Sequence, residues 1–383
     1  MAQADANLEA FARARRVVLK IGSSLFVDAT TGRLDTPWLE ALAEDVAMLR
    51  AEGREVVIVS SGAVALGRRE LGLDATRLKL EDKQAAAAVG QILLAHAYKE
   101  LLGRHDIKVA QVLLTLDDSE SRRRYLNAVR TLTTLLTAGV VPVINENDTV
   151  ATAELRYGDN DRLAGRVAQM VSADCLIVLS DVDGLYTADP QSDPAAEHIA
   201  QVDLLEPRFF EMAGGPGSRH GTGGMRTKLE AARIAVGAGC RMAITNGHVS
   251  RPVSALKADA RATWFLATAT PRAARKQWIA GSLKPKGRVV VDAGAQTALA
   301  GGRSLLPAGV TAVDGEFERG DSVSIVAGDG RELGRGLIAY SRAEAAAIAG
   351  KRSELIAGIL GYGGRNEMIH RDDLALIPED PKA

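Results

Sequence analysis

The sequence has few cysteines, few aromatic residues and no excess of charge of either sign. Its 383 residues include two cysteines, Cys175 and Cys240, and aromatic side chains make up 4% of them. Both cysteines lie in apolar surroundings where strands are expected to begin, so we expect no disulfide framework and predict a reduced, cytoplasmic protein. Lys and Arg number 47 against 48 Asp and Glu, a formal net charge of −1. This balance lacks the general basic excess that favours nucleic-acid binding.

Long apolar segments are also missing. No apolar run reaches the length of about eighteen residues that a membrane-spanning helix needs, so we expect no membrane span. The segment 1–15 mixes acidic and basic residues without a continuous apolar stretch, and it therefore does not resemble a signal peptide. A chain of this length is predicted to form more than one domain.

Short β-branched runs alternate with longer helical patterns along most of the chain. This alternation is typical of an α/β fold, in which helices cover a mainly parallel sheet. The predicted strands span residues 17–21, 56–60, 109–114, 140–145, 176–180 and 242–245, and the predicted helices span 37–52, 82–102, 123–138, 161–171 and 225–238. Ligands of open α/β sheets bind beyond the carboxyl ends of the strands. We therefore expect the polar residues that follow these strands to form one site.

A glycine-rich segment precedes the last of these helices. It runs from Gly221 to Lys228 and places the lysine in the first turn of the helix. Glycines let backbone amides approach a phosphate closely, and the helix N-terminus adds the positive end of its dipole. The segment is not a Walker A loop, because its lysine does not follow the last glycine directly. The alternative is a flexible loop that caps an ordinary helix.

Polar residues stand in or after four of the predicted strands. They are Lys20 in the first strand, Ser60 and Ser61 after the second, Asn145 through Asp148 after the fourth, Asn160 and Asp161 at the start of the next helix, and Ser180 and Asp181 after the fifth strand. Taken singly, each could be a surface charge, a helix cap or part of a polar loop. Together they indicate a site for a small polar substrate and an anion.

These motifs occur in the order found in glutamate 5-kinases, and the chain resembles that family over almost its whole length. The resemblance rests on residues 20–24, 59–63, 143–148, 158–161, 180–187 and 221–228. It implies the fold of the amino acid kinase superfamily. It also implies transfer of the γ-phosphoryl group of ATP to the side-chain carboxylate of L-glutamate, the first step of proline biosynthesis.

The resemblance assigns a role to each residue of the expected site. Lys20, Asp161 and Lys228 would be catalytic, with Asp161 orienting the two lysines. Ser61, Asp148 and Asn160 would bind L-glutamate. The nucleotide would be bound by Lys20, Ser180, Asp181, Thr222, Gly223, Gly224, Met225, Arg226, Thr227 and Lys228. Mg²⁺ would be carried in with ATP, and we assign it no side-chain ligand.

After about residue 275 the alternation of strands with long helices ends, and short strands separated by turns follow. We therefore predict a kinase domain over residues 1–275 and a second domain with a C-terminal tail over residues 276–383. Short predicted strands at 289–291, 310–313, 323–327 and 336–340 indicate a β-rich module with little helix, and we expect the last residues to form a surface tail. The run from Ser304 to Val310 and the turn at Gly320 and Asp321 resemble a PUA domain.

Two alternatives follow from these observations. Because PUA domains bind RNA in RNA-modifying proteins, the chain could be an RNA-binding protein with a regulatory kinase-like half. Acidic residues are mixed with the arginines of residues 286–350 and aromatics are few, which disfavours this reading. The second alternative is an amino acid kinase that acts on another small acid. The family resemblance also implies feedback inhibition by proline and assembly into a homo-oligomer.

Overall fold

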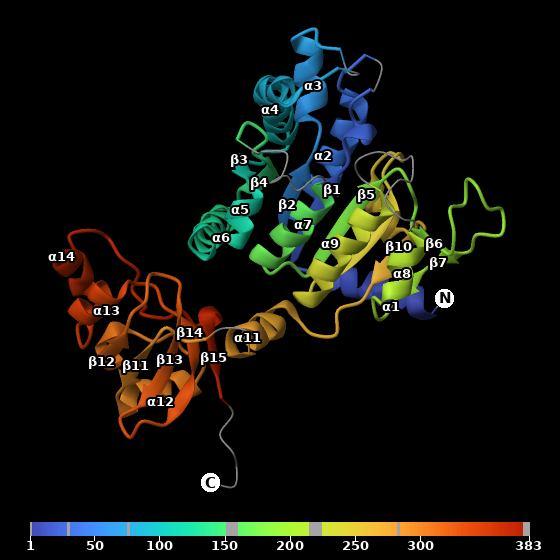
Figure 1. Ribbon diagram of the computed structural model, residues 1–383. Helices are drawn as coiled ribbons and strands as arrows, with labels where there is room; N and C mark the ends of the chain where they lie inside the picture. Colours follow the sequence, from blue (N-terminus) through green and yellow to red (C-terminus); the bar gives the residue numbers. More distant parts are fainter. Residues whose placement is uncertain are drawn as a thin grey trace. The chain divides into compact units, whose positions relative to one another are not determined.

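The computed structural model divides the chain into two compact units, Met1–Pro271 and Arg272–Ala383 (Figure 1). It describes residues 2–28, 31–74, 77–150, 160–213, 224–281 and 284–377. The division falls at the start of helix α11 (Pro271–Gly281). The boundary predicted at residue 275 lies inside this helix, because the sequence signal for the second domain came from the turns and strands that follow it.

The first unit is built on one eight-stranded sheet, in the order β3-β4-β2-β1-β5-β9-β10-β8. Its strands are β1 (Arg16–Ile21), β2 (Glu55–Ser60), β3 (Val109–Leu114), β4 (Val141–Glu146), β5 (Cys175–Ser180), β8 (Gln201–Val202), β9 (Arg241–Asn246) and β10 (Ala262–Phe265). The six predicted strands are confirmed and run parallel to one another. Strand β10, which the sequence did not predict, is antiparallel to β9. Cys175 and Cys240 are buried free thiols near the starts of β5 and β9.

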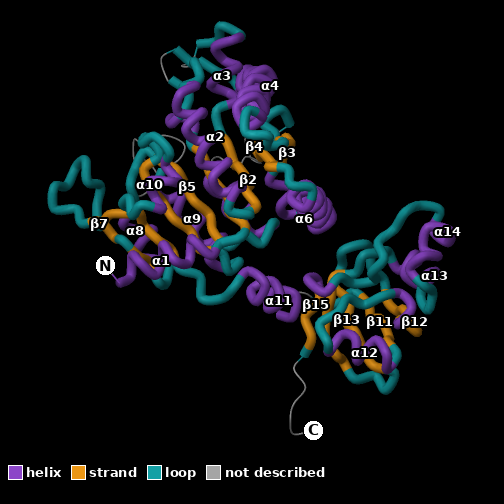
Figure 2. The backbone as a smooth tube through the Cα atoms, turned by 180° about the vertical axis from the view of Figure 1, so that it is seen from behind, coloured by secondary structure: helices purple, strands orange, loops and turns teal. Residues whose placement is uncertain are grey.

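Helices cover both faces of this sheet (Figure 2). They are α1 (Ala2–Arg13), α2 (Thr36–Ala51), α3 (Ala63–Glu70), α4 (Leu80–Gly103), α5 (Leu116–Glu120), α6 (Arg122–Thr137), α7 (Asn160–Met170), α8 (Pro207–Met212), α9 (Met225–Gly237) and α10 (Pro252–Lys257). One core cluster joins the sheet to α2 and α4, and another joins it to α6, α7 and α9. Alternate residues of β1 enter different clusters, Leu19 the first and Val18 the second, because successive strand side chains point to opposite faces. The five predicted helices are confirmed.

Two helices of the first unit cross with almost no space between them. A Cβ atom added at Gly67 of α3 would overlap the backbone at Ala86 of α4, and one added at Gly90 of α4 would overlap the backbone at Ala63. This approach is open only to glycine, because any side chain would force the backbones apart. Since α3 follows β2 directly, the crossing fixes α4 against the end of β2.

The second unit has a five-stranded sheet, in the order β12-β11-β13-β14-β15. Its strands are β11 (Gly287–Val291), β12 (Val310–Gly315), β13 (Ser322–Ala327), β14 (Glu332–Leu337) and β15 (Leu374–Leu376), and its further helices are α12 (Ala293–Ala300), α13 (Arg342–Ile348) and α14 (Ile356–Leu360). A separate core cluster includes Val289, Ile325 and Tyr340.

Three predictions about the second unit were wrong. The strand expected at 336–340 begins at Glu332 and ends at Leu337. Ile338 still exchanges backbone hydrogen bonds with Gly320 and Asp321, but the backbone N–H of Ala339 donates to Met368 instead. The expectation of little helix overlooked α12 to α14, which are short. The C-terminal segment is not simply a surface tail: Met368 and Ile369 are fully buried and β15 extends the sheet. No helix in the described parts of the chain is both long enough and apolar enough to span a bilayer.

Candidate active site

Two lysines and one aspartate form a buried ion-pair cluster at the centre of the first unit. Lys20 comes from β1, Asp161 from the first turn of α7 and Lys228 from the first turn of α9. Lys20 Nζ pairs with Asp161 Oδ1, and Lys228 Nζ lies 3.2 Å from Asp161 Oδ2. The Asp161 side chain is 0% exposed. The three residues that the sequence assigned to catalysis are therefore brought together.

The charge state of Asp161 is set by its two partners. Burial alone raises the pKa of this carboxyl, because a low-dielectric interior disfavours the charged form. The positive charges of Lys20 and Lys228 and their hydrogen bonds act in the opposite direction and hold the pKa of Asp161 below its ordinary value. The cluster thus contains two cations and one anion, and its net positive charge suits an anionic ligand.

Close packing of α7 against α9 brings Asp161 to Lys228. Gly165, one turn after Asp161, lies so near Ala231 that an added Cβ atom would come within 2.9 Å of the Ala231 carbonyl oxygen. The hydroxyl of Thr227 lies 3.0 Å from Asp161 Oδ2 and 2.7 Å from the carbonyl oxygen of Gly224, the residue before α9. The first turn of α9 holds no acidic residue. Its backbone N–H groups and Lys228 can therefore face an anion together.

A second polar cluster joins the ends of β2 and β4 to the start of α7. Asn160 is buried. Its Nδ2 lies within hydrogen-bond distance of three acceptors, which are the Ser60 carbonyl oxygen at 2.8 Å, Ser61 Oγ at 3.0 Å and Asn145 Oδ1 at 2.8 Å. The turn at Ser61 depends on Gly62, whose φ of 103° is in a region that glycine adopts without strain. Ser61 is half-buried, and Asp148 is half-buried in the turn after β4. These groups can bind ammonium, hydroxyl or carboxylate groups of a small ligand.

The predicted nucleotide residues follow β5 and begin α9. Ser180 is buried and its hydroxyl donates to Asp181 Oδ1 at 2.9 Å, while Asp181 is exposed. Gly224, Met225 and Thr227 are half-buried and Arg226 is exposed. Thr222 and Gly223 lie outside the described residues.

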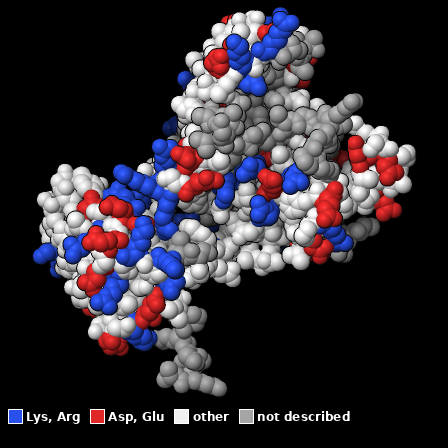
Figure 3. All heavy atoms as spheres, in the orientation of Figure 1, with Lys and Arg blue, Asp and Glu red and all other residues white. Residues whose placement is uncertain are grey.

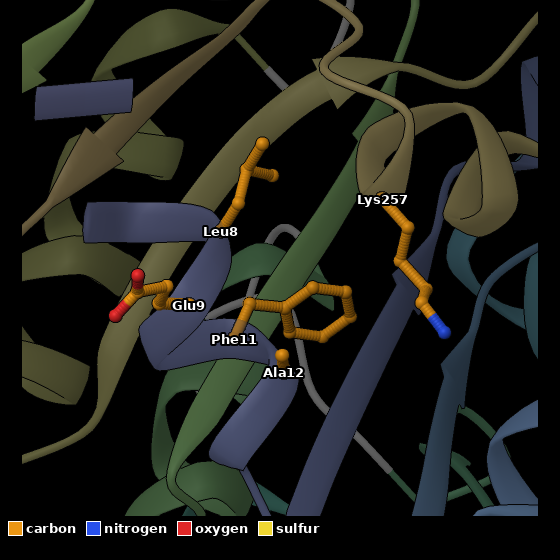
Figure 4. A pocket seen from close by; sticks show the side chains of 5 residues that line it. All are labelled: Leu8, Glu9, Phe11, Ala12 and Lys257. Atoms are coloured by element: carbon orange, nitrogen blue, oxygen red, sulfur yellow. The ribbon is translucent and has the colours of Figure 1, made fainter. Parts of the chain in front are cut away.

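Two hollows of the first unit are lined by residues other than those of the ion-pair cluster. One of about 430 Å³ lies between α1 and α10 and is lined by Leu8, Glu9, Phe11, Ala12 and Lys257. In Figure 4 the Glu9 carboxylate and the Lys257 ammonium point away from the Phe11 ring between them. A second, of about 740 Å³, lies beside α8 and α9 and includes Arg226. Within the described residues, no three acidic, histidine or cysteine side chains form a metal-binding group.

Sequence reasoning missed two side chains of helix α4. Gln91 Oε1 accepts a hydrogen bond of 2.8 Å from Asn145 Nδ2, and Tyr98 Oη lies 2.9 Å from Ser60 Oγ. Both are buried. The signal available in the sequence was a glutamine between apolar residues of a predicted helix, which does not by itself reveal what the glutamine faces.

Comparison with known proteins identifies the families to which the two parts of the chain are similar. Residues 15–246 match the amino acid kinase family and residues 287–360 match the PUA domain. The glutamate 5-kinase of Paramagnetospirillum magneticum is 62% identical over 365 residues, 95% of this chain and 98% of that protein. That of Rhodospirillum rubrum is 59% identical over 359 residues, 94% of this chain and 96% of that protein.

Among solved structures, carbamate kinase from Giardia lamblia bound to AMP-PNP is 17% identical, with a TM-score of 0.49, and the match covers 67% of this chain and 99% of that one. The matches at about 60% identity span both units. The chain therefore belongs to the glutamate 5-kinases of the amino acid kinase family, and it carries a PUA domain.

Proposed function

We propose that this protein transfers the γ-phosphoryl group of ATP to the side-chain carboxylate of L-glutamate, with the Lys20, Asp161 and Lys228 cluster as its catalytic centre. The observation that carries the proposal is the shared burial of these three charges beside the polar cluster of Asn160 and Ser61. A phosphoryl donor and a carboxylate acceptor are both anions, so the site must chiefly position them and offset their repulsion.

Each lysine has a separate task in this proposal. Lys20 holds the phosphates from β1, and Lys228 stabilises the charge on the phosphoryl group during transfer. Asp161 keeps the two ammonium groups together, since two buried cations without a counter-charge would repel each other and lose solvation. No general base is needed, because a glutamate side chain with a pKa of about 4.3 is already ionised at neutral pH.

The acceptor site is assigned to the polar cluster at the ends of β2 and β4. Ser61, Asn160 and Asp148 bind glutamate. The Ser61 hydroxyl, which accepts from Asn160 Nδ2, can donate to a carboxyl group of glutamate, and Asp148 pairs with its α-ammonium group. Ser180 and Asp181 are assigned to the nucleoside, and the residues from Thr222 to Lys228 are assigned to the phosphates. The family pattern supports these roles, and the mutations described below test them.

Mg²⁺ is assigned to ATP, whose phosphate oxygens and waters it prefers over an all-protein cage. We further infer, from the family alone, a cytoplasmic homo-oligomer that proline inhibits. RNA binding is not part of the proposal. Figure 3 shows acidic and basic side chains mixed over the visible face of the second unit, without the continuous basic surface that RNA binding favours.

The reaction is tested by following ADP release with ATP, Mg²⁺ and L-glutamate while hydroxylamine traps any acyl phosphate. Aspartate, N-acetylglutamate, carbamate and UMP serve as parallel acceptors. The proposal predicts hydroxamate with glutamate and little with the others. Turnover on another acid, with none on glutamate, would overturn the substrate assignment and leave the phosphoryl-transfer site in place.

A further inference from the structure

Helix α4 presents two polar side chains to the acceptor site from its buried face. Gln91 and Tyr98 are seven residues apart, which places them on one side of the helix two turns apart. Gln91 is 8% exposed and Tyr98 is 3% exposed. Gln91 contacts the end of β4 through Asn145, and Tyr98 contacts the end of β2 through Ser60.

The hydrogen bonds around Asn145 determine which way its carboxamide faces. Its Oδ1 accepts from the backbone N–H of Glu146 at 2.8 Å and from Asn160 Nδ2 at 2.8 Å. Both neighbours are donors, so a reversed carboxamide would place its NH₂ group against two other N–H groups. Asn145 Nδ2 must therefore point to α4, and the residue it meets there must be an acceptor.

Gln91 provides that acceptor through Oε1. Its own Nε2 is buried and has no hydrogen-bond partner among the described residues. A buried N–H without a partner is unfavourable, yet only the oxygen of the Gln91 side chain takes part in the Asn145 contact. A carboxyl group in the same place could accept the same hydrogen bond.

We propose that Gln91 is a positioning residue of the acceptor site: by accepting from Asn145 Nδ2, it holds Asn145 Oδ1 toward Asn160 and so orients Asn160 against Ser61. This inference rests on the proposed function, because it assigns to Asn160 and Ser61 the binding of glutamate. Gly90, the neighbour of Gln91, is locked against α3, so the position of the Gln91 backbone is fixed by the helix crossing.

Three variants test the inference. Q91M keeps the length of the side chain and removes the acceptor, whereas Q91E keeps an acceptor oxygen in either protonation state. I92A is the matched control, because Ile92 is next to Gln91 on α4 and 72% exposed. We expect Q91M to raise the KM for L-glutamate on the order of tenfold, the effect of leaving a buried amide donor unsatisfied. The KM for ATP should stay within about twofold.

Q91E should keep the KM for glutamate within about threefold of the wild type, since the introduced carboxyl group can still accept the hydrogen bond from Asn145 Nδ2. I92A should not differ from the wild type. Calorimetric titration of glutamate and thermal unfolding of each variant separate binding from stability. A positioning role predicts a selective loss of glutamate affinity, whereas a packing role predicts a lower Tm with both KM values unchanged or changed alike.

The inference is overturned if folded Q91M binds glutamate like the wild type, or if Q91E is as impaired as Q91M. Should Q91M fail to fold, the comparison of Q91E with wild type decides alone: a large rise in its KM for glutamate contradicts the acceptor role. Wild-type protein that does not phosphorylate glutamate would instead contradict the proposed function, which the parallel acceptor assay detects separately.

Discussion

At the scale of single residues, Asp161 determines the charge balance of the active site. It is fully buried and meets both lysines, so its carboxylate compensates two cations in a place with little water. In the proposed function, the net positive charge that remains is what attracts the triphosphate of ATP.

The first prediction concerns Lys228. Lys228→Ala should lower kcat by about 10²–10³-fold and leave the KM for glutamate largely unchanged, because the ammonium group acts on charge that develops in the transition state. Steady-state kinetics measure this effect. Arg233→Ala is the control, since Arg233 is an exposed cation of the same helix. Unchanged turnover in Lys228→Ala would remove this lysine from the mechanism.

A second prediction concerns Asp148. Asp148→Asn keeps the shape of the side chain and removes its charge, so it should raise the KM for glutamate roughly tenfold or more, as expected for a lost hydrogen bond to a charged group. The kcat should change much less. A loss confined to kcat would contradict the pairing of Asp148 with the α-ammonium group.

The third prediction is a pH dependence of stability that comes from Asp161. Its pKa is lower in the folded than in the unfolded protein. The stabilisation is therefore complete above the unfolded value, near ~3.9, and is lost as the pH falls through the lower folded value. Urea unfolding of wild type and Asp161→Asn between about pH 6 and 3 measures the difference.

Asp161→Asn should be less stable than wild type at neutral pH by about 3–5 kcal/mol, because it leaves two buried cations without their anion. The difference in the free energy of unfolding between the two proteins should become smaller as the pH falls. A difference that stays constant over this range would mean that the Asp161 charge does not stabilise the fold.

At the scale of secondary-structure elements, the α3–α4 crossing holds the acceptor side of the site. The crossing depends on Gly67 and Gly90, where a side chain would overlap the facing backbone. It fixes the helix that carries Gln91 and Tyr98 against the helix that follows Ser61. The polar groups at the ends of β2 and β4 are therefore held by packing as well as by hydrogen bonds.

The fourth prediction tests that crossing. Gly90→Ala should lower the free energy of unfolding by about 1–3 kcal/mol or more, since overpacking forces the two helices apart. Gly103→Ala is a matched control, because Gly103 is also in α4 and an added Cβ atom there meets nothing within 4 Å. The control should be neutral or slightly stabilising, as alanine favours a helix. Equal effects in denaturant titrations would show that the close crossing is unimportant.

At the scale of the whole molecule, the chain has two units with separate hydrophobic clusters. One cluster of the first unit includes Phe11 and Trp264, its other cluster includes Phe265, and the cluster of the second unit includes Phe317 and Tyr340. The ion-pair cluster and the polar cluster are formed by residues of the first unit. This arrangement places the proposed chemistry in one unit.

The fifth prediction follows from this division. A protein truncated after Pro271 should fold and unfold cooperatively, and it should keep the KM for glutamate of the full chain, because its core and site are intact. Circular dichroism during urea unfolding and the hydroxamate assay measure both properties. Aggregation or loss of cooperativity would contradict the independence of the first unit.

Much of the fold and the members of the ion-pair cluster could be predicted from the sequence, the latter with the help of the family resemblance. Periodic apolar patterns identified the parallel strands and their helices, because burial imposes those patterns locally. Lys20, Asp161 and Lys228 were assigned through the resemblance to the glutamate 5-kinases, whose motifs they occupy at strand ends and helix starts. Short or weakly patterned elements, such as β10 and the helices of the second unit, were missed because little local pattern distinguishes them from loops.

Only the tertiary structure decided which residues meet across large separations in the chain. Gln91 and Asn145 are 54 residues apart, and Asp161 and Lys228 are 67 residues apart. The function of Gln91 depends on the direction of a carboxamide on another strand, and that direction depends on two further donors. Such a contact leaves no periodicity in the sequence, because it is determined by the packing of α4 against the sheet and not by the neighbours of Gln91 in the chain.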